Sequence, residues 1–428
     1  ELDVPTADGS VPAVHAVAGG ADLPMEPIAP PVPGDRVVRY RAQLEVPAFG
    51  WQAIDLVPGL PATPPAAVTL ELLDGAGQPA AGDAVARVVL ANAAVRSEWT
   101  RVDGRFALTS LVLGGHSVLA GPSMIVRDYH DDGGLWRLGH EMPGCAYTAD
   151  PAGADHETVQ VLEAGRLGAR VAFVGADATR EAALTAGADA LDVAITTAAP
   201  LATTRTVDLA LASTDPLSSS VPGGAAVRPG ARVYAPTYWA AVSWARTGDV
   251  AVLLRQSTGA RMDSPGALEL MVARDARQEG CDVEGGTGTD TGVHRIEWRL
   301  VRAPDDAAAD RQAQAFDRPL SIIATGAAPA GAGDLPAAGT LLSVVDGDGL
   351  VSAFKPADRG AGLVLRVLGR APSRVRIDPL VPLAAAPTAT AVDLAERDLD
   401  GAVPLTDRTV SFDPSQRGSI ETVRLASP

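Results

Sequence analysis

Glycine and proline interrupt this chain along its whole length, and no other feature restricts its fold as strongly. The 428 residues include 44 Gly and 34 Pro, spread along the chain and not gathered in one tract. They cut the apolar sequence into short pieces, which is the pattern of many short strands joined by turns. Helical periodicity is weak. The best candidate for a helix is Pro304 to Phe316, whose Asp- and Ala-rich start suits a helix N-terminus.

Three segments illustrate the strand pattern. Arg36 to Glu45 alternates apolar and polar side chains in part, so that one face can be buried. The Asp103-Gly104 pair between two apolar runs is a strong signal for a β-hairpin. From Gly339 to Gly369, a strand, an Asp-Gly turn and two further strands predict a β-meander. No repeat of roughly 20–50 residues is evident, which disfavours a solenoid or a propeller, and the length predicts two or three domains.

The charge of the chain excludes one large class of partners. The formal net charge is −17 and the sequence pI is about 4.7. Because nucleic-acid binding requires clustered Lys and Arg side chains to neutralise phosphates, we expect no nucleic-acid partner. Lys355 is the only lysine, and together with the excess of Ala and Gly this indicates a GC-rich bacterial genome.

The cysteines and the apolar runs bear on the compartment. Cys145 and Cys281 are too few for a disulfide framework and too far apart for a zinc ligand pair. Because cytosolic disulfides are rare, we expect two free thiols, with a bridge as the alternative. No apolar run approaches the roughly 20 residues that span a bilayer, and no signal sequence opens the chain. We therefore expect a soluble protein without a membrane partner and favour a bacterial cytoplasm. Since Glu1 lies in strand-rich sequence, we also expect a further portion upstream.

The segment from Leu253 to Leu300 says most about function. It holds a strand, a Gly/Pro turn, a second strand that ends in Leu-Glu-Leu-Met-Val-Ala-Arg at Arg274, and a later Thr-Gly-Val-His-Arg strand. Upstream, Val88 to Gly115 contains an Asn-bearing strand, an Asp-Gly turn and a Leu-Thr-Ser-Leu-Val strand. Downstream, one pattern contains Lys355, Pro356, Gly362 and Arg366. The chain then closes with a strand from Ser419 to Leu425. In this order the segments resemble the C-terminal half of glycoside hydrolase family 38, the class II α-mannosidases.

This resemblance implies an all-β fold in three parts. Residues 1–60 would form a small β-domain, the end of a β-sandwich begun upstream, and residues 61–83 a linker. Residues 84–330 would form a large β-supersandwich of the galactose-mutarotase-like type. Residues 331–428 would form a C-terminal β-sandwich.

The resemblance also implies a function. The chain would be the C-terminal β-portion of a zinc-dependent retaining α-mannosidase, which hydrolyses α-mannosides. In the family, the zinc ion and the carboxylate nucleophile lie on an N-terminal barrel, so both are expected outside this chain, and no catalytic residue or metal ligand is assigned within it. The expected partners are an α-mannoside or other carbohydrate and the N-terminal catalytic barrel of the same enzyme, and a homo-oligomer of unspecified size is compatible. The chain alone is expected to be inactive.

Most candidate residues for the substrate cleft lie in one polar segment, 127–142. Some bacterial family members carry a similar segment on the rim that faces the barrel, which makes Asp128, Asp131, Asp132, Trp136, Arg137 and His140 candidates. Trp136 and Tyr129 could stack on a sugar ring, although core packing would explain them equally well. Asp131 and Asp132 beside Gly133 could form a cation-binding loop. We favour a solvated loop paired with nearby arginines, because neither an EF-hand nor an HExxH motif is present.

Two further candidates follow from the resemblance. Arg274 keeps the position of an arginine that lies near the active site in family members, although Ala273 replaces the preceding histidine and an Arg-Gly pair is missing. His294 matches a histidine in bacterial members, and a structural role at a strand edge is the alternative.

Two other function classes remain open. The chain could be a non-catalytic carbohydrate-binding or scaffold protein built from the same sandwiches. A lyase or epimerase on a mutarotase-like sandwich would need His, Tyr or Glu side chains that the sequence does not place in one cleft. The aromatic cluster Tyr234, Tyr238, Trp239 and Trp244 is predicted to lie in the core.

Overall fold

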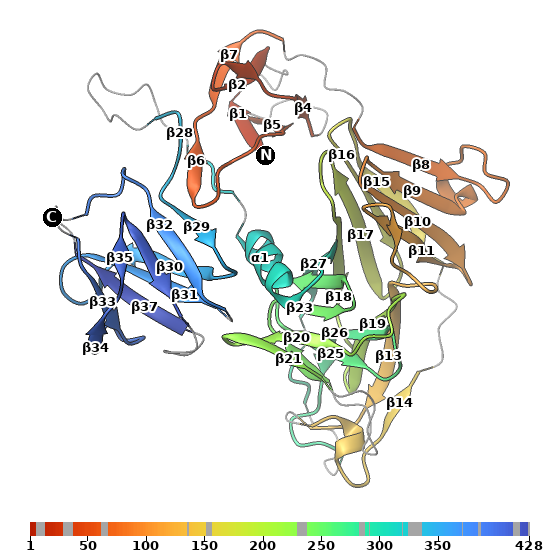
Figure 1. Cartoon of the computed structure of the whole chain (residues 1–428). Helices are drawn as coiled ribbons and strands as arrows, with labels where there is room; N and C mark the ends of the chain where they lie inside the picture. Colours follow the sequence, from red (N-terminus) through yellow and green to blue (C-terminus); the bar gives the residue numbers. More distant parts are fainter. Residues whose placement is uncertain are drawn as a thin grey trace.

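The computed structural model (Figure 1) describes residues 1–5, 13–28, 37–60, 67–134, 137–150, 156–228, 238–281, 287–290, 292–318, 320–323, 336–369, 371–383, 387–413 and 420–426. These residues form β-sheets in which neighbouring strands pair antiparallel. The described part of the chain contains one α-helix. The expected all-β architecture is confirmed.

The described residues among the first 60 form a small unit with two three-stranded sheets. One sheet consists of β1 (Leu2–Pro5), β5 (Val37–Ala42) and β4 (Met25–Pro27), and the other of β3 (Ala21–Asp22), β2 (Val14–Ala18) and β7 (Asp55–Pro58). The predicted strand at 36–45 is confirmed as β5. Its buried residues Val38 and Tyr40 alternate with exposed ones and pack on Met25 and Ala16.

A short two-stranded sheet joins this unit to the C-terminal part of the chain. In it, β6 (Gly50–Gln52) pairs with β28 (Ala338–Thr340). Glycine is required on both sides, because a Cβ atom at Gly50 would lie 2.0 Å from the oxygen of Gly339, and one at Gly339 would lie 2.5 Å from the Trp51 ring. Trp51 also donates from Nε1 to the carbonyl of Pro336 at 2.9 Å.

The central part of the chain is a large sandwich of three sheets. The five-stranded sheet orders β12 (His116–Ser117), β11 (Arg105–Leu113), β10 (Val95–Val102), β9 (Arg87–Ala91) and β8 (Thr69–Leu73). The six-stranded sheet orders β14 (Tyr147–Ala149), β13 (Ile125–Asp131), β19 (Thr203–Ala210), β26 (Ala267–Asp275), β25 (Thr258–Met262) and β22 (Trp239–Ala241). The nine-stranded sheet orders β15 (Thr158–Ala164), β16 (Gly168–Val174), β17 (Ala178–Thr185), β18 (Leu191–Thr197), β27 (His294–Arg302), β24 (Val250–Leu254), β23 (Trp244–Thr247), β20 (Ser218–Val221) and β21 (Gly224–Val227).

All three sheets contribute to one apolar core. Aromatic rings from two of them meet there, with Trp99 stacked on Phe173 at 4.6 Å between ring centroids and Phe106 at 5.1 Å from the same ring. The expected linker at 61–83 is too long at its C-terminal end, because β8 lies within it and pairs with β9. The rest of the expected division into domains stays a prediction.

The turn after β10 has the predicted hairpin form. Val102 pairs with Arg105, and the two residues between them, Asp103 and Gly104, have φ angles of +49° and +86°. Positive φ at both central positions defines the type I′ turn, which Asp-Gly favours.

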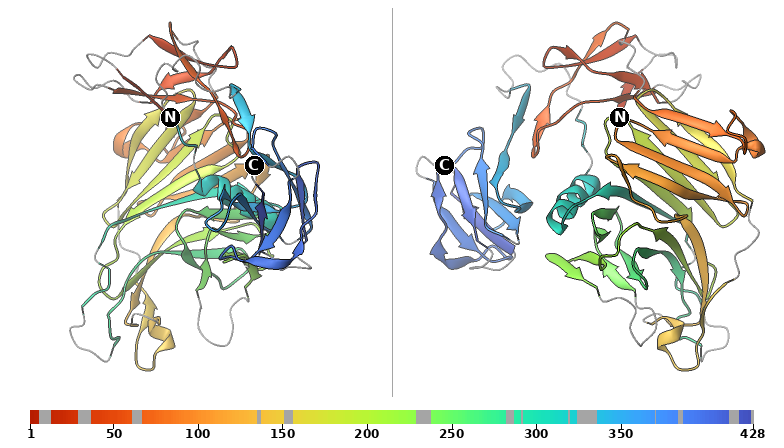
Figure 2. Two further views of the ribbon diagram at one scale, coloured as in Figure 1. Left: turned by 90° about the vertical axis from the view of Figure 1, so that its left-hand side faces the viewer. Right: turned by 45° about the vertical axis from the view of Figure 1, so that its right-hand side comes forward.

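The helix α1 (Asp306–Asp317) confirms the helix predicted near 304–316. The Asp305 side chain accepts a hydrogen bond from the amide of Ala308 at 2.7 Å and so caps the first turn. The helix packs its buried face on Trp244, whose indole donates to Asp310 at 2.6 Å. It lies on the side of the large sandwich that faces the C-terminal sheets (Figure 2), and Gln314 donates to the carbonyl of Val351 there.

The C-terminal sandwich has a four-stranded and a five-stranded sheet. The first orders β29 (Leu342–Asp346), β32 (Ser373–Ile377), β36 (Thr409–Phe412) and β35 (Leu405–Thr406). The second orders β30 (Leu350–Pro356), β31 (Leu363–Leu368), β37 (Ile420–Leu425), β33 (Ala389–Val392) and β34 (Asp398–Ala402). The predicted β-meander is therefore wrong, because the Asp-Gly turn carries the chain from β29 in one sheet to β30 in the other. Tight packing at the crossing explains the glycine, since a Cβ at Gly347 would lie 2.2 Å from the carbonyl oxygen of Pro372.

Candidate functional site

A pocket of about 610 Å³ opens at one end of the large sandwich, where β26 ends and β27 begins. Its walls come from the segment 253–300, which the sequence singled out, and from the residues beside β22. The lining residues are Tyr238, Ala240, Gln256, Ser257, Thr258, Gly259, Met271, Val272, Ala273, Arg274, Asp290, His294, Arg295 and Ile296. Two of the candidate cleft residues, Arg274 and His294, lie in it.

A buried ion pair fixes Arg274 at the pocket wall. Its Nε donates to Oδ2 of Asp131 at 2.7 Å, and Asp131 is fully buried. Asp131 also accepts from Thr204 Oγ1 at 2.7 Å and from the amides of Gly133 and Gly139. Burial alone would raise the pKa of Asp131, but the hydrogen bonds from Arg274 and Thr204 outweigh it and hold this pKa below the ordinary value.

The same arginine holds the loop between β13 and β14. Its Nη2 donates to the carbonyl oxygens of Gly134 and Arg137 at 3.1 and 3.0 Å. Arg274 itself lines the pocket. The loop backbone packs closely, since a Cβ at Gly139 would lie 1.8 Å from the carbonyl oxygen of Ala146.

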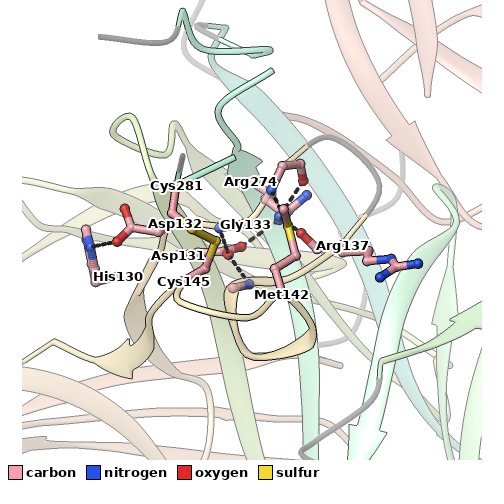
Figure 3. Close-up of a disulfide and its surroundings, with 11 residues drawn as sticks. His130, Asp131, Asp132, Gly133, Arg137, Met142, Cys145, Arg274 and Cys281 are labelled. Atoms are coloured by element: carbon pink, nitrogen blue, oxygen red, sulfur yellow. Dashed lines mark hydrogen bonds and ion pairs between the residues drawn. A yellow bond between two sulfur atoms is a disulfide. The ribbon is translucent and has the colours of Figure 1, made fainter. Parts of the chain in front are cut away.

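A disulfide joins Cys145 in this loop to Cys281 in the connection after β26 (Figure 3). The expectation of two free thiols is therefore wrong. Sequence spacing could not show the pairing, because 136 residues separate the cysteines while their Cα atoms lie 5.3 Å apart. Disulfides persist mainly in oxidising compartments, so the bond weighs against the cytoplasm favoured from the sequence. Among the described residues, no helix is long and apolar enough to cross a membrane.

Apart from Arg274 and His294, none of the described candidates lines the pocket. Asp132 pairs with His130 at 3.0 Å. Arg137 offers its carbonyl to Arg274, whereas its side chain is exposed and points away (Figure 3). His140 packs edge-on against the Tyr147 ring at 4.9 Å. Trp136 lies outside the described residues.

Asp128 lies apart from this group. Successive strand residues point to opposite faces, so Asp128 faces away from Asp131 on the same strand. Its carboxylate binds the buried Arg205 through Nε and Nη2 at 2.7 and 2.6 Å. That contact joins the neighbouring strands β13 and β19, and neither residue lines the pocket.

His294 is the second candidate in the pocket. Its Nε2 lies 2.5 Å from Oδ2 of Asp290, which also lines the pocket. The Asp290 amide donates to Asp275 at 2.8 Å, which fixes the loop that carries this carboxylate. The pair gives the pocket a polar, half-exposed group in addition to Arg274.

A tyrosine cluster beside the pocket was missed by sequence reasoning. Tyr129 and Tyr147 stack at 5.0 Å, and the Tyr147 hydroxyl lies 3.1 Å from that of Tyr238. Tyr238 and Tyr129 both donate to Glu269, which Arg261 binds through Nε and Nη2. Burial, with the Glu269 charge, raises the pKa of Tyr129 to about 12 and also raises the pKa values of Tyr147 and Tyr238.

This cluster supports the pocket, and Tyr238 is the member that lines it. The three phenol groups and the Glu269 carboxylate bind one another and Arg261. Of the aromatic residues predicted as core, Trp244 is fully buried, Tyr238 and Trp239 are half-buried, and Tyr234 lies outside the described residues.

The described residues do not fit a metal. Residues 130–132 do have a His-x-Asp spacing, but His130 and Asp132 pair with each other and Asp131 is fully engaged. In the described ranges, no group of three or more His, Cys, Asp or Glu side chains is placed to hold a metal ion. No step involving zinc is therefore assigned to this chain.

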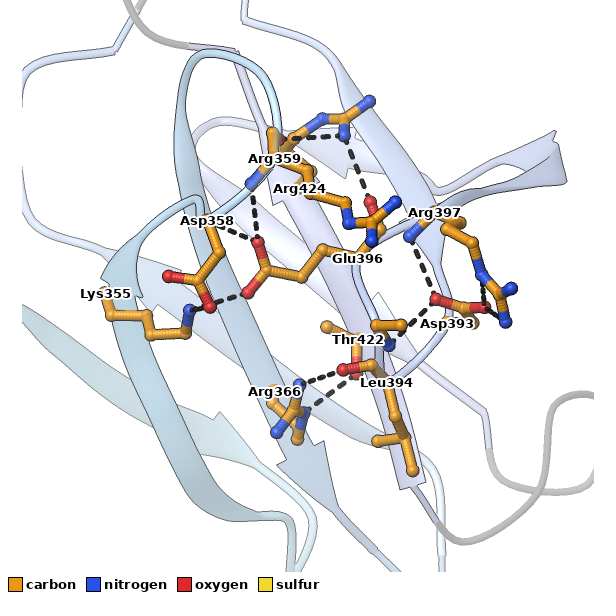
Figure 4. Close-up of polar contacts among 11 residues, drawn as sticks. Lys355, Asp358, Arg359, Arg366, Asp393, Leu394, Glu396, Arg397, Thr422 and Arg424 are labelled. Carbon is orange, nitrogen blue, oxygen red and sulfur yellow. Dashed lines mark hydrogen bonds and ion pairs between the residues drawn. The ribbon is translucent and has the colours of Figure 1, made fainter.

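A second polar cluster lies in the C-terminal sandwich (Figure 4). Lys355 binds Oε1 of the buried Glu396 at 2.6 Å, and Glu396 accepts from the amides of Asp358 and Arg359. Arg366 donates to Thr422 at 3.1 Å on the neighbouring strand. These contacts join two loops and two strands, which is a structural role.

The fold matches those of glycoside hydrolases. A protein of glycosyl hydrolase family 38 from Enterococcus faecalis superposes with a TM-score of 0.70 at 13% identity, over 97% of this chain and 53% of that one. An α-mannosidase from Enterococcus faecalis V583 superposes with a TM-score of 0.70 at 12% identity, over 97% and 51%. The chain thus spans about half the length of each. The sequence itself matches no protein-family profile and no curated protein.

Proposed function

We propose that this chain forms the β-sandwich portion of a glycoside hydrolase of the α-mannosidase type. The observation that carries the proposal is the superposition of 97% of the chain on a glycosyl hydrolase family 38 protein and on an α-mannosidase. Because the chain spans about half of those proteins, the remaining half would supply a catalytic barrel with zinc and a carboxylate nucleophile. The partners are then that barrel and an α-mannoside or another carbohydrate.

The pocket at Arg274 is the surface that would meet the sugar. Carbohydrates present many hydroxyl groups, each a donor and an acceptor, and binding sites match them with a few fixed polar groups. The pocket is lined by Arg274, the His294–Asp290 pair, and the polar residues Gln256 and Ser257. Arg274 is held by Asp131, so its guanidinium is already ordered before a ligand arrives.

Catalysis is assigned to groups outside this chain. Retaining glycosidases use two carboxyl groups about 5–5.5 Å apart. The pocket carboxylate Asp290 is paired with His294, and Arg295 in the wall is bound to Glu181. This arrangement suits binding and orientation of a substrate more than bond cleavage.

The test compares the isolated chain with the product of the complete reading frame. We expect hydrolysis of an aryl α-mannoside by the complete product and none by the isolated chain. In the complete product, Arg274→Ala should raise KM with a smaller change in kcat, because Arg274 binds the substrate without reacting. Arg374→Ala, an exposed arginine on β32 in the C-terminal sandwich, serves as the matched control. Turnover by the isolated chain would indicate a free-standing enzyme. A complete product that lacks a barrel and only binds sugar would indicate a carbohydrate-binding protein. Either result would overturn the proposal.

A further inference from the structure

We propose that the nine-stranded sheet, on the face turned away from the main apolar core, carries a binding site for a small oxyanion, with Arg170 and Arg255 as the groups that attract it. The oxyanion is a carboxylate or a phosphate, since both match the planar N–H donors of a guanidinium group. The site is a recess of about 200 Å³ lined by residues of β16, β17, β18, β27 and α1 and by Arg255, which follows β24.

Two alanines form the floor of the recess. Ala194 on β18 pairs with Glu181 on one neighbouring strand and with Glu297 on the other, and Ala183 on β17 pairs with Arg170. Residues directly opposite each other in an antiparallel pair lie on the same face of the sheet. Short alanine side chains beside long charged ones therefore leave a hollow in a face that would otherwise be level.

The charges around the recess do not balance. Its lining residues include four arginines and three carboxylates, although the whole chain has a net charge of −17. Arg295 and Arg299 each make two hydrogen bonds to one carboxylate, to Glu181 and Asp192 respectively. Glu297 is then the one lining carboxylate left for the other two arginines.

Those two arginines are Arg170 and Arg255, which lie on opposite sides of the recess with β17, β18 and β27 between them. Arg170 is 3.9 Å from Glu181, and Nε of Arg255 is 3.3 Å from Glu297. Within the described part of the chain, neither guanidinium makes a side-chain hydrogen bond, and Nε of Arg170 is buried without an acceptor. Since a guanidinium has five N–H donors, both can still bind an anion.

One side of the recess is ordered by an aromatic ring. The guanidinium carbons of Arg255 and Arg299 lie 4.8 and 4.7 Å from the centroid of the buried Phe316 ring at the end of α1. Such cation–π contacts hold the flat guanidinium groups in place. A ligand then loses less affinity to the ordering of these side chains.

The recess adjoins the pocket at Arg274, because Arg295 lines both. An anion in the recess would therefore lie beside a carbohydrate in the pocket. On the proposed function, the substrate class is then an acidic carbohydrate whose carboxylate or phosphate group occupies the recess. This last step rests on the proposed function, whereas the oxyanion site itself does not.

The test is calorimetric titration of the chain at low ionic strength with glucuronate, with inorganic phosphate and with neutral glucose. We expect saturable binding of an anion and no binding of glucose. Arg170→Gln and Arg255→Gln should each weaken binding at least about threefold, and added salt should weaken it in the parent chain, because partly exposed charges are screened. Arg374→Gln, on β32 in the C-terminal sandwich, is the control and should bind like the parent.

A further variant separates anion binding from a purely structural role. Glu297→Gln removes the carboxylate beside Arg255 and should strengthen anion binding about threefold, which is the scale of a partly exposed ion pair. A residue that merely stabilises the sheet would not improve binding when its charge is removed. Tighter binding of glucuronate than of phosphate supports an organic carboxylate as the ligand, and the reverse order supports a phosphate.

The inference is overturned if neither anion binds saturably, if glucose binds as well as glucuronate, or if both arginine variants bind like the parent. It is also overturned if the isolated chain binds glucuronate and the product of the complete reading frame does not, because the rest of the protein would then cover the recess. If glucuronate binds and a mannose-containing oligosaccharide does not, the oxyanion site stands and the proposed function fails.

Discussion

Arg274 and Asp131 lie 143 residues apart in the sequence and form a 2.7 Å charge-assisted hydrogen bond beneath the pocket wall. Asp131 is fully buried and uses its remaining acceptor sites for Thr204 and two loop amides. The pair thus connects three strands and one loop, and it orders the guanidinium that the pocket presents.

Removal of the Asp131 charge should destabilise the chain. Asp131→Asn leaves Arg274 without its anion, and breaking a buried pair costs about 3 kcal/mol. Chemical denaturation would measure the free energy of unfolding of the sandwich. Asp132→Asn is the neighbouring control, since its pair with His130 is partly exposed and should contribute about 1 kcal/mol at most. Equal losses in both variants would contradict the role given to Asp131.

A methyl group at Gly139 should displace the loop. Gly139→Ala would place a Cβ atom 1.8 Å from the carbonyl oxygen of Ala146, and such overpacking costs about 2 kcal/mol. Gly75→Ala meets no atom within 4 Å and should change stability by less than about 1 kcal/mol. Thermal unfolding of the two variants compares them directly. A Gly139→Ala variant as stable as the parent would show that the loop can move without cost.

Alkaline pH should act through the tyrosine cluster. The pKa of Tyr129 is raised from 10.0 to about 12 by burial and by Glu269. A group with a raised pKa contributes stability that is complete below its unfolded pKa and is lost as pH rises through its folded pKa. The cluster should therefore stabilise the chain up to about pH 10 and lose that contribution between pH 10 and 12. Phenolate absorbance should show tyrosines that ionise above pH 10, fewer of them in Tyr129→Phe; ionisation of all tyrosines near pH 10 would refute this.

Local features were predictable from the sequence, whereas contacts between distant segments were not. Asp103-Gly104 and the capped helix at Asp306–Asp317 depend on adjacent residues, so spacing alone identified them. The turn at Gly347 was predicted to lie within a β-meander, because an Asp-Gly turn looks the same in the sequence whether the next strand joins the same sheet or the opposite one.

In the candidate site, too, local features could be predicted from the sequence and contacts between distant segments could not. The resemblance led to Arg274 and His294, which share one pocket. The Cys145–Cys281 bond, the contact of Tyr129 with Glu269 and the pairing of Asp128 with Arg205 join residues 136, 140 and 77 positions apart in the sequence. The period-two alternation of β13 could have separated Asp128 from Asp131, because it sends the two side chains to opposite faces.

The central claim, that the pocket at Arg274 binds carbohydrate, is tested most directly by calorimetric titration of the oxidised chain with a mannose-containing oligosaccharide. We predict measurable binding by the parent chain and by Arg374→Ala, and binding at least about tenfold weaker by Arg274→Ala. A tenfold loss corresponds to about 1.4 kcal/mol, which is typical for a hydrogen bond from a charged group. Equal binding by all three proteins, or none by any of them, would contradict the claim.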